Sequence, residues 1–194
     1  MWTKEFFGMD VYHLVTAFMI YSILGWLVES IYMSFCNHRL TNRGFAKGPF
    51  CPIYGFGAVI GYIILHPLKG NVVLLYFVGA ILATIFEYLV GLGMKKIFGL
   101  VWWDYNDKPY NYKGMICLES TVAWGFYAII IVFFLHKAVI GMIDRYHVVF
   151  NRNFIVFLYG IVVIDYMVQI CRALHINVKE KLSDKYQNIK ARWY

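Results

Sequence analysis

RLTNRGFAKGPFCPIYGFG, residues 39–57, separates two long apolar segments with cations, two prolines and four glycines. Proline fixes φ and lacks an N–H donor, whereas glycine permits positive φ or a close approach of two backbones. A plain linker at a membrane boundary does not need so many special backbone positions. The stretch therefore predicts a turn-rich, cationic loop that re-enters the bilayer. The alternative is an ordinary connector between two helices.

The composition of the whole chain indicates an integral membrane protein. Of its 194 residues, 61% are hydrophobic and 15% are charged, whereas soluble domains are about 45–50% apolar and about 25% charged. The length suits about five spanning helices of roughly 20 residues each. We therefore expect an all-α, polytopic protein of a bacterial plasma membrane. The net charge of +7 is interpreted as topology control and attraction to an anionic membrane surface, and no nucleic-acid partner is expected.

Five apolar stretches are the expected spans, at residues 11–36, 52–65, 72–94, 115–135 and 154–174. Residues 136–153 would connect the last two, with a short surface helix as one option. We divide the chain into a transmembrane domain, 1–176, and a basic amphipathic cytosolic tail, 177–194, for which a frayed, solvated segment is the alternative. On the third span Gly79, Ala83, Glu87, Gly91 and Lys95 recur every four residues, which predicts a packed interior face.

The small residues of the chain allow two further predictions. Gly57 and Gly61 have the small-xxx-small spacing of close helix contacts, either within the chain or in a homo-oligomer. The four cysteines form neither a CxxC pair nor a metal-ligand spacing. Cys51 and Cys117 both lie beside the polar loops and could meet in space. We expect reduced thiols rather than a disulfide there, because both are placed on the cytosolic side.

The distribution of positive charge predicts the topology. With five spans, five of the 18 lysines and arginines fall on the side of the N-terminus and thirteen on the other side. The positive-inside rule then places the N-terminus outside and the C-terminus in the cytosol. Both polar loops, at residues 39–51 and 100–114, would face the cytosol.

Four acidic side chains are expected at one depth in the membrane. Counted from the cytosolic helix ends at a rise of 1.5 Å per residue, they lie roughly 9–12 Å inside the boundary. A carboxylate at that depth must be paired, protonated or in contact with water. We therefore predict a polar cluster in the cytosolic half of the bundle, roofed by the two loops, although these groups could serve only to pair helices. The four acids are Glu29, Glu87, Glu119 and Asp165.

The second loop, LVWWDYNDKPYNYKG at residues 100–114, combines interfacial aromatics with turn-forming and hydrogen-bonding residues. A simple aromatic belt is the alternative to a role in the site. We hypothesise that Asp104 pairs with Arg39 or Arg43 across the two loops. The complete set of candidate substrate-binding residues is Glu29, Arg39, Asn42, Arg43, Glu87, Asp104, Asn111, Glu119 and Asp165.

Several motifs in order carry a family resemblance. They are NRG, FAK and GP at residues 42–49, CPIYGFG at 51–57, EYLVG at 87–91, WWDY at 102–105, KPYN at 108–111, CL at 117–118 and WG at 124–125. Over residues 21–125, and more loosely at the helix of Asp165, the chain resembles the putative type IV ABC-transporter permease family of bacterial membrane proteins. The resemblance implies a role in transport. Glu119 departs from the family pattern.

The motifs that are missing narrow the functional classes. The chain has no GxxxxGK[ST] loop, so an ABC role would need a separate ATPase subunit on the cytosolic loops. It also has no HExxH, GxSxG or metal motif, and we expect no metal, no cofactor and no catalytic residue. A transport protein or subunit with a polar site of acids and arginines is the favoured function. The alternatives are a membrane-embedded enzyme acting on a lipid or head group, and a scaffold that docks another membrane subunit.

Overall fold

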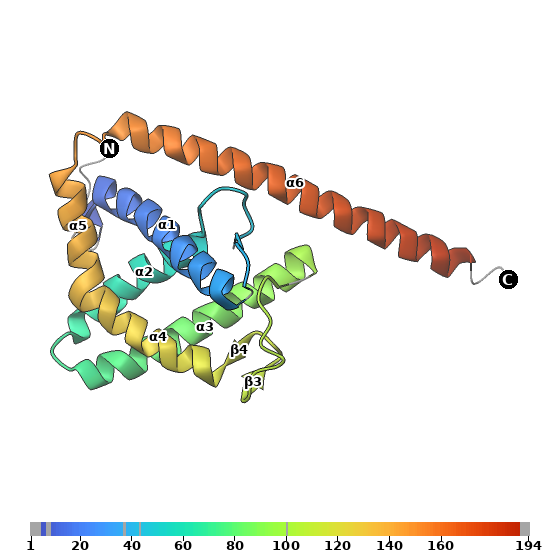
Figure 1. The fold of residues 1–194 in the computed structure, drawn as a ribbon, viewed down its shortest axis with the longest axis horizontal. Helices are drawn as coiled ribbons and strands as arrows, with labels where there is room; N and C mark the ends of the chain where they lie inside the picture. The colour runs from blue at the N-terminus through green and yellow to red at the C-terminus, as the bar shows by residue number, and fades with distance from the viewer. Residues whose placement is uncertain (1–4, 7–8, 37, 43, 100, 191–194) are drawn as a thin grey trace.

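The structure, a computed structural model, describes residues 5–6, 9–36, 38–42, 44–99 and 101–190, with side chains from Met9 to Ala173. Within these ranges the chain is almost entirely helical (Figure 1). The helices are α1 Val11–Cys36, α2 Pro52–Leu65, η1 His66–Leu68, α3 Val72–Phe98, α4 Leu118–Ile130, η2 Ile131–Leu135, α5 His136–Arg145 and α6 Arg152–Lys190. Two short antiparallel pairs complete it, β1 Glu5–Phe6 with β2 Met9–Asp10, and β3 Asn111–Tyr112 with β4 Ile116–Cys117.

The membrane spans confirm the all-α, polytopic prediction and refine its boundaries. Four helical stretches are long and apolar enough to cross a bilayer, at Val11–Cys36, Val72–Phe98, Leu118–Arg145 and Arg152–Ala173. The apolar helix Pro52–Leu68 is shorter. The span that begins at Leu118 does not end at Leu135 as expected. It continues through the π-helical η2 into α5, because a π turn inserts a residue without breaking the helix.

The loop between α1 and α2 returns to the middle of α1 before α2 begins. The N–H of Cys51 donates to the carbonyl oxygen of Ser22 at 3.1 Å, and Ser22 lies roughly 21 Å along the helix axis from the end of α1. Gly55, in the first turn of α2, packs so closely that a Cβ there would overlap the Ser22 hydroxyl. The loop is therefore re-entrant, and α2 begins at mid-depth beside α1.

The face of small residues on α3 is an interior face, as predicted, and it packs against α4 and against the loop that precedes α4. A Cβ at Gly79 would overlap the Cβ of Ala128, and one at Gly91 would meet the sulfur of Met115 at 3.4 Å. The close helix contact predicted at Gly57 and Gly61 is wrong within this chain at Gly61. Among the described residues, a Cβ at Gly61 would meet no other atom within 4 Å, so the close approach of α2 to α1 is made at Gly55 instead.

Helix α6 lies beside the bundle, and the re-entrant loop fills the space between it and α1 (Figure 1). The Tyr159 hydroxyl donates to the carbonyl oxygen of Val15 at 2.9 Å, and the Tyr166 hydroxyl donates to that of Phe50 at 3.1 Å. Most of α6 up to Ala173 is not covered by the rest of the protein and would face lipid in a membrane. The helix continues without a break through residue 177, so the division into a bundle and a tail stays a prediction.

Candidate functional site

Glu87 is a buried carboxylate in the middle of a membrane-spanning helix. Its exposed fraction is 5%. Oε1 accepts a hydrogen bond from the Tyr105 hydroxyl at 3.0 Å, and Oε2 accepts one from Trp124 Nε1–H at 3.0 Å and a longer one from the Ser120 hydroxyl at 3.4 Å. All three donors are uncharged. Among the described residues, no lysine or arginine lies within ion-pair distance of this carboxylate.

The donors reach Glu87 because the second loop also turns back into the bundle. Gly99 ends α3 with a left-handed φ of 77°, a conformation that costs glycine little. The chain then reverses, and Tyr105 returns to the level of Glu87, roughly 17 Å along the helix axis from the end of α3. The hydrogen bond from Trp103 Nε1–H to the Met115 carbonyl oxygen, at 2.7 Å, ties the two arms of this loop together.

The first turns of α4 supply the other two donors. Cys117 caps the N-terminus of α4, and its sulfur accepts a hydrogen bond from the N–H of Ser120 at 3.4 Å. Ser120 and Trp124 are four residues apart and therefore lie on one face of the helix. That face is the one in contact with α3.

Glu29 on α1 lies near this carboxylate. Its Oε2 accepts a hydrogen bond from the Tyr54 hydroxyl at 2.9 Å, and the Tyr54 ring lies 6.4 Å from the Trp124 ring. Glu29 and Glu87 are within electrostatic range of each other. We call the two acids and the four residues that hydrogen-bond to them the acid–phenol cluster: Glu29, Tyr54, Glu87, Tyr105, Ser120 and Trp124.

The protonation of Tyr105 fixes the direction of its hydrogen bond. Burial, followed by the adjacent Glu87 carboxylate, raises the pKa of the Tyr105 phenol. The phenol therefore keeps its proton at neutral pH and acts as the donor, with a Glu87 oxygen as the acceptor. In this cluster the Glu87 carboxylate is held by neutral hydroxyl and indole donors, an arrangement in which it can bind a proton or a small cation.

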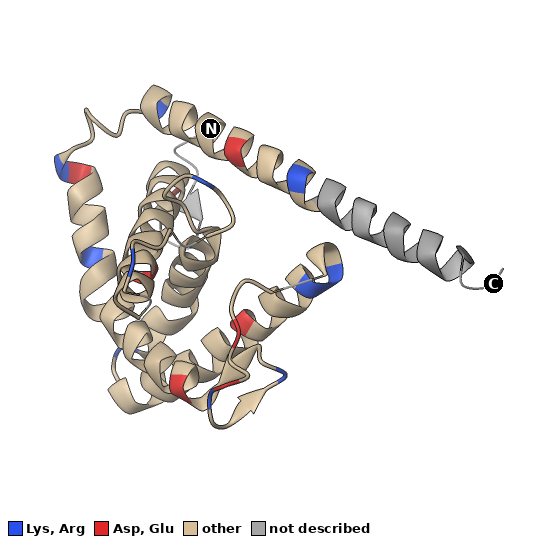
Figure 2. Ribbon diagram, turned by 45° about the vertical axis from the view of Figure 1, so that its right-hand side comes forward, with Lys and Arg blue, Asp and Glu red and all other residues tan. Residues whose placement is uncertain are grey.

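The other predicted acids lie elsewhere. The side chain of Glu119 is 61% exposed and forms a 2.8 Å ion pair with Lys108. Asp104 accepts hydrogen bonds from the N–H and the side-chain amide of Asn106 in its own loop. Figure 2 shows that most described charges lie near helix ends and in loops, with long uncharged stretches between them.

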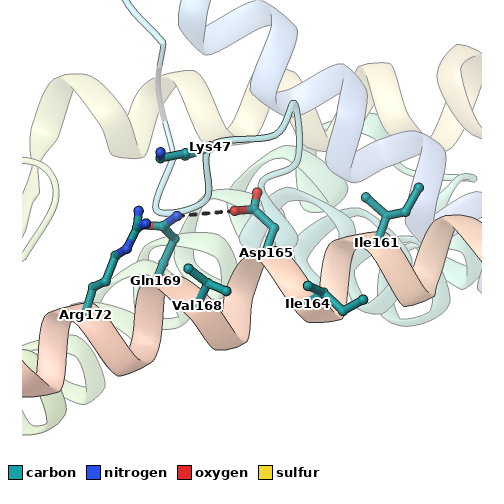
Figure 3. Close-up of a pocket in the computed structure, with 7 residues that line it drawn as sticks. All are labelled: Lys47, Ile161, Ile164, Asp165, Val168, Gln169 and Arg172. Carbon is teal, nitrogen blue, oxygen red and sulfur yellow. Dashed lines mark hydrogen bonds between the residues drawn. The ribbon is translucent and has the colours of Figure 1, made fainter.

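Asp165 on α6 belongs to a separate place at the loop end of the bundle, the end at which the chain leaves α1 and α3. Its Oδ2 accepts a hydrogen bond from the N–H of Gly48 at 2.7 Å, and its Oδ1 accepts one from the Gln169 amide at 3.3 Å. Lys47 and Arg172 lie beside it and line a cleft of about 350 Å³ between the re-entrant loop and α6 (Figure 3). Asp165, Gln169 and Arg172 all line this cleft, because their spacing of four and three residues places them on one face of α6.

Two of the predicted polar residues hold the loops in shape. Asn42 accepts a hydrogen bond from Trp26 Nε1–H at 2.6 Å and donates to the carbonyl oxygen of Lys47 at 3.0 Å. Asn111 donates to the carbonyl oxygen of Lys108 at 2.8 Å and accepts from the N–H of Gly114 at 3.2 Å. The Asn111 contacts lie within its own loop, whereas Asn42 joins its loop to α1 through Trp26.

The two loops meet through aromatic rings. The centroid of the Phe45 ring lies 4.3 Å from the centroid of the Trp102 ring and 5.7 Å from that of the Tyr166 ring on α6. In the described part of the chain no ion pair joins Arg39, which is exposed, to Asp104, and Arg43 lies outside the described residues. The two loops therefore meet through tilted aromatic rings, and among the described residues the hypothesised Asp104–Arg39 pair is not formed.

Sequence reasoning did not identify Tyr54, Ser120 and Trp124 as site residues. The spacing of Ser120 and Trp124 was the available signal, because it places a hydroxyl and an indole donor on one face of an apolar helix. Cys51 and Cys117 are buried, and in the described part of the chain neither belongs to a disulfide. Among the described residues, no group of three histidine, cysteine or acidic side chains could hold a metal ion.

Comparison with known proteins yields one match. The family model described as "Putative ABC-transporter type IV" matches residues 16–170, which include α1 to α5 and the part of α6 that carries Asp165. No curated protein and no solved structure matches the chain.

Proposed function

This chain belongs to the family described as "Putative ABC-transporter type IV", and from that premise we propose that it is a permease-like transport subunit whose polar site is the acid–phenol cluster. Its membrane spans and its family make it a transport-related membrane protein. The proposal adds that Glu29 and Glu87 bind a small cation or carry a proton.

The observation that carries the proposal is the environment of Glu87. A buried carboxylate that served only to join helices would be expected to have a cationic partner, because an unpaired charge in the membrane costs several kcal/mol. Glu87 has three neutral donors instead, and a second carboxylate, Glu29, lies within electrostatic range. An ionised Glu87 at low dielectric is costly, and a bound proton or small cation removes that cost.

The energy source would lie outside this chain. The sequence has no phosphate-binding GxxxxGK[ST] loop, so ATP-driven transport requires a separate ATPase subunit. The loop end, where Phe45, Trp102 and Tyr166 join the two loops to α6, is the surface that would pass a partner's movement to the cluster. Co-purification of an ATPase with the full chain tests this part of the proposal.

Transport is tested first with the purified full chain in proteoliposomes. Flux of protons and of a panel of small cations is recorded with a pH-sensitive dye and with cation-selective electrodes. Glu87→Gln is expected to lower the flux at least tenfold, because the amide keeps the shape of the side chain but can neither carry a proton nor balance a cation. The matched control is Glu119→Gln, since Glu119 is exposed and paired with an exposed lysine, and its flux should stay within twofold of the parent.

A chemical measurement tests the site without knowledge of the substrate. Hydrophobic carbodiimides modify carboxyl groups that carry a proton inside the membrane, and mass spectrometry locates the adduct. We expect modification at Glu87 that increases as the pH falls and slows when a bound cation competes. Modification of Glu119 and not of Glu87, or full flux in Glu87→Gln, would refute the proposed site.

A further inference from the structure

The cleft between the re-entrant loop and α6 is separate from the acid–phenol cluster. It has a volume of about 350 Å³ and is lined by residues of α6 together with Lys47 of the loop (Figure 3). The proposed transport function does not use it. Its two halves differ in chemistry, and that difference identifies a ligand.

One half of the cleft is apolar and is open on the lipid side. Ile161, Ile164 and Val168 line it, with exposed fractions of 50%, 66% and 40%. They belong to a span of high hydropathy that the rest of the chain leaves almost uncovered. An alkyl chain is therefore the ligand group that this half accommodates.

The other half is polar and lies at the membrane surface. Arg172 is one residue from the end of the span Arg152–Ala173, and Figure 3 shows Lys47, Gln169 and Arg172 gathered at this end, with the isoleucines at the opposite end. Asp165 lies between the halves, but its carboxylate already accepts hydrogen bonds from the N–H of Gly48 and from Gln169. Two cations and one engaged carboxylate leave this end with a net positive charge.

We propose that the cleft binds one anionic phospholipid, with the head-group phosphate between Lys47 and Arg172 and an acyl chain along Ile161, Ile164 and Val168. Basic pockets at the ends of membrane helices are a known means of holding anionic head groups. Inorganic phosphate would use only the cationic half. A zwitterionic lipid would fill the apolar half but would bring a positive group close to the arginine.

The test is lipid binding to the purified, delipidated full chain in a neutral detergent, followed by native mass spectrometry. Phosphatidylglycerol, phosphatidylcholine with the same acyl chains, and inorganic phosphate are the three probes. We expect one phosphatidylglycerol to bind more tightly than the other two. Because a surface lysine or arginine favours anionic lipid by an amount equivalent to about a fivefold change in affinity, Lys47→Gln and Arg172→Gln should each weaken binding by about that factor.

Two further variants separate this site from general attraction to lipid. Lys96→Gln removes an exposed positive charge from the last turn of α3, also at the loop end, and should leave the affinity unchanged. Val168→Trp fills the apolar half without changing charge, and should weaken the binding of phosphatidylglycerol. Equal binding of the two lipids, equal effects of Lys47→Gln and Lys96→Gln, or displacement of the lipid by millimolar phosphate would each overturn the proposal.

Discussion

Replacing Tyr105 by phenylalanine removes a single hydroxyl and, with it, the 3.0 Å hydrogen bond to Glu87 Oε1. Glu87 is only 5% exposed, so water cannot readily replace the phenol. A hydrogen bond to a charged group contributes about 1.5–3 kcal/mol, and one between neutral groups about 0.5–1.5 kcal/mol. With an ionised Glu87, Tyr105→Phe should therefore lower the free energy of unfolding by about 1.5–3 kcal/mol.

A double-mutant cycle with Glu87→Gln isolates the contribution of the charge. The glutamine keeps a carbonyl acceptor but carries no charge, so Tyr105→Phe should cost about 0.5–1.5 kcal/mol in that background. The difference between the two costs, on the order of 1 kcal/mol, is the coupling energy. It is measured by reversible unfolding in mixed detergent micelles, followed by circular dichroism.

The matched control for this cycle is Tyr110→Phe. Tyr110 lies in the same loop but is 83% exposed, so loss of its hydroxyl should change the stability by less than about 0.5 kcal/mol. If Tyr105→Phe and Tyr110→Phe cost the same amount, then the second loop does not bring its phenol to Glu87. The account of the acid–phenol cluster would then be refuted.

Three further predictions concern the scaffold. Gly79→Leu should destabilise the protein by about 1–3 kcal/mol through overpacking against α4, whereas Gly61→Leu, which meets open space, should be neutral in the same unfolding assay. Asn42→Ala should expose the re-entrant loop to protease several-fold faster, because it loses two hydrogen bonds, and Asn153→Ala on the surface of α6 should not. Asp10 gives a pH dependence: partial burial favours its protonated form, but hydrogen bonds from the first turn of α1 outweigh this effect and lower its pKa below the ordinary 3.8. Its contribution to the free energy of unfolding is at most about 1 kcal/mol at this partly exposed site. That contribution should be constant above about pH 4 and disappear as the pH falls through the lowered pKa. The loss of stability between pH 5 and pH 3 should therefore be smaller in Asp10→Asn than in the parent.

The interior position of Glu87 could be predicted from the sequence, whereas that of Glu119 could not. Small residues one helical turn before and after Glu87 indicate a face that another helix must cover, because such residues allow close packing. The first turn of α4 instead carries Glu119, Ser120 and Thr121 in succession, so polar side chains point to several sides of the helix and do not indicate a single inward face. A rotation of about 100°, one residue along the helix, decides between Glu119 and Ser120. The structure turns Ser120 toward Glu87.

The re-entrant character of the first loop followed from its prolines and glycines, but its depth did not. The depth depends on the hydrogen bond from Cys51 to the carbonyl oxygen of Ser22 and on that from Gly48 to Asp165. Both partners lie far away in the sequence, and no local pattern specifies them. The local partner of Asp104, by contrast, is an ordinary turn interaction with a residue two positions away, which is a simpler arrangement than a pair between two loops.

The dependence of the first loop on Asp165 sets an order for biogenesis. Backbone N–H groups do not enter hydrocarbon unless acceptors are in place, and the acceptor for Gly48 belongs to α6, which leaves the ribosome after α1 to α5. In a nascent chain that stops before residue 152, we therefore expect α1 to be inserted while residues 39–51 remain at the membrane surface. The first loop should therefore reach its final position only after α6 has been inserted, although it is synthesised well before α6.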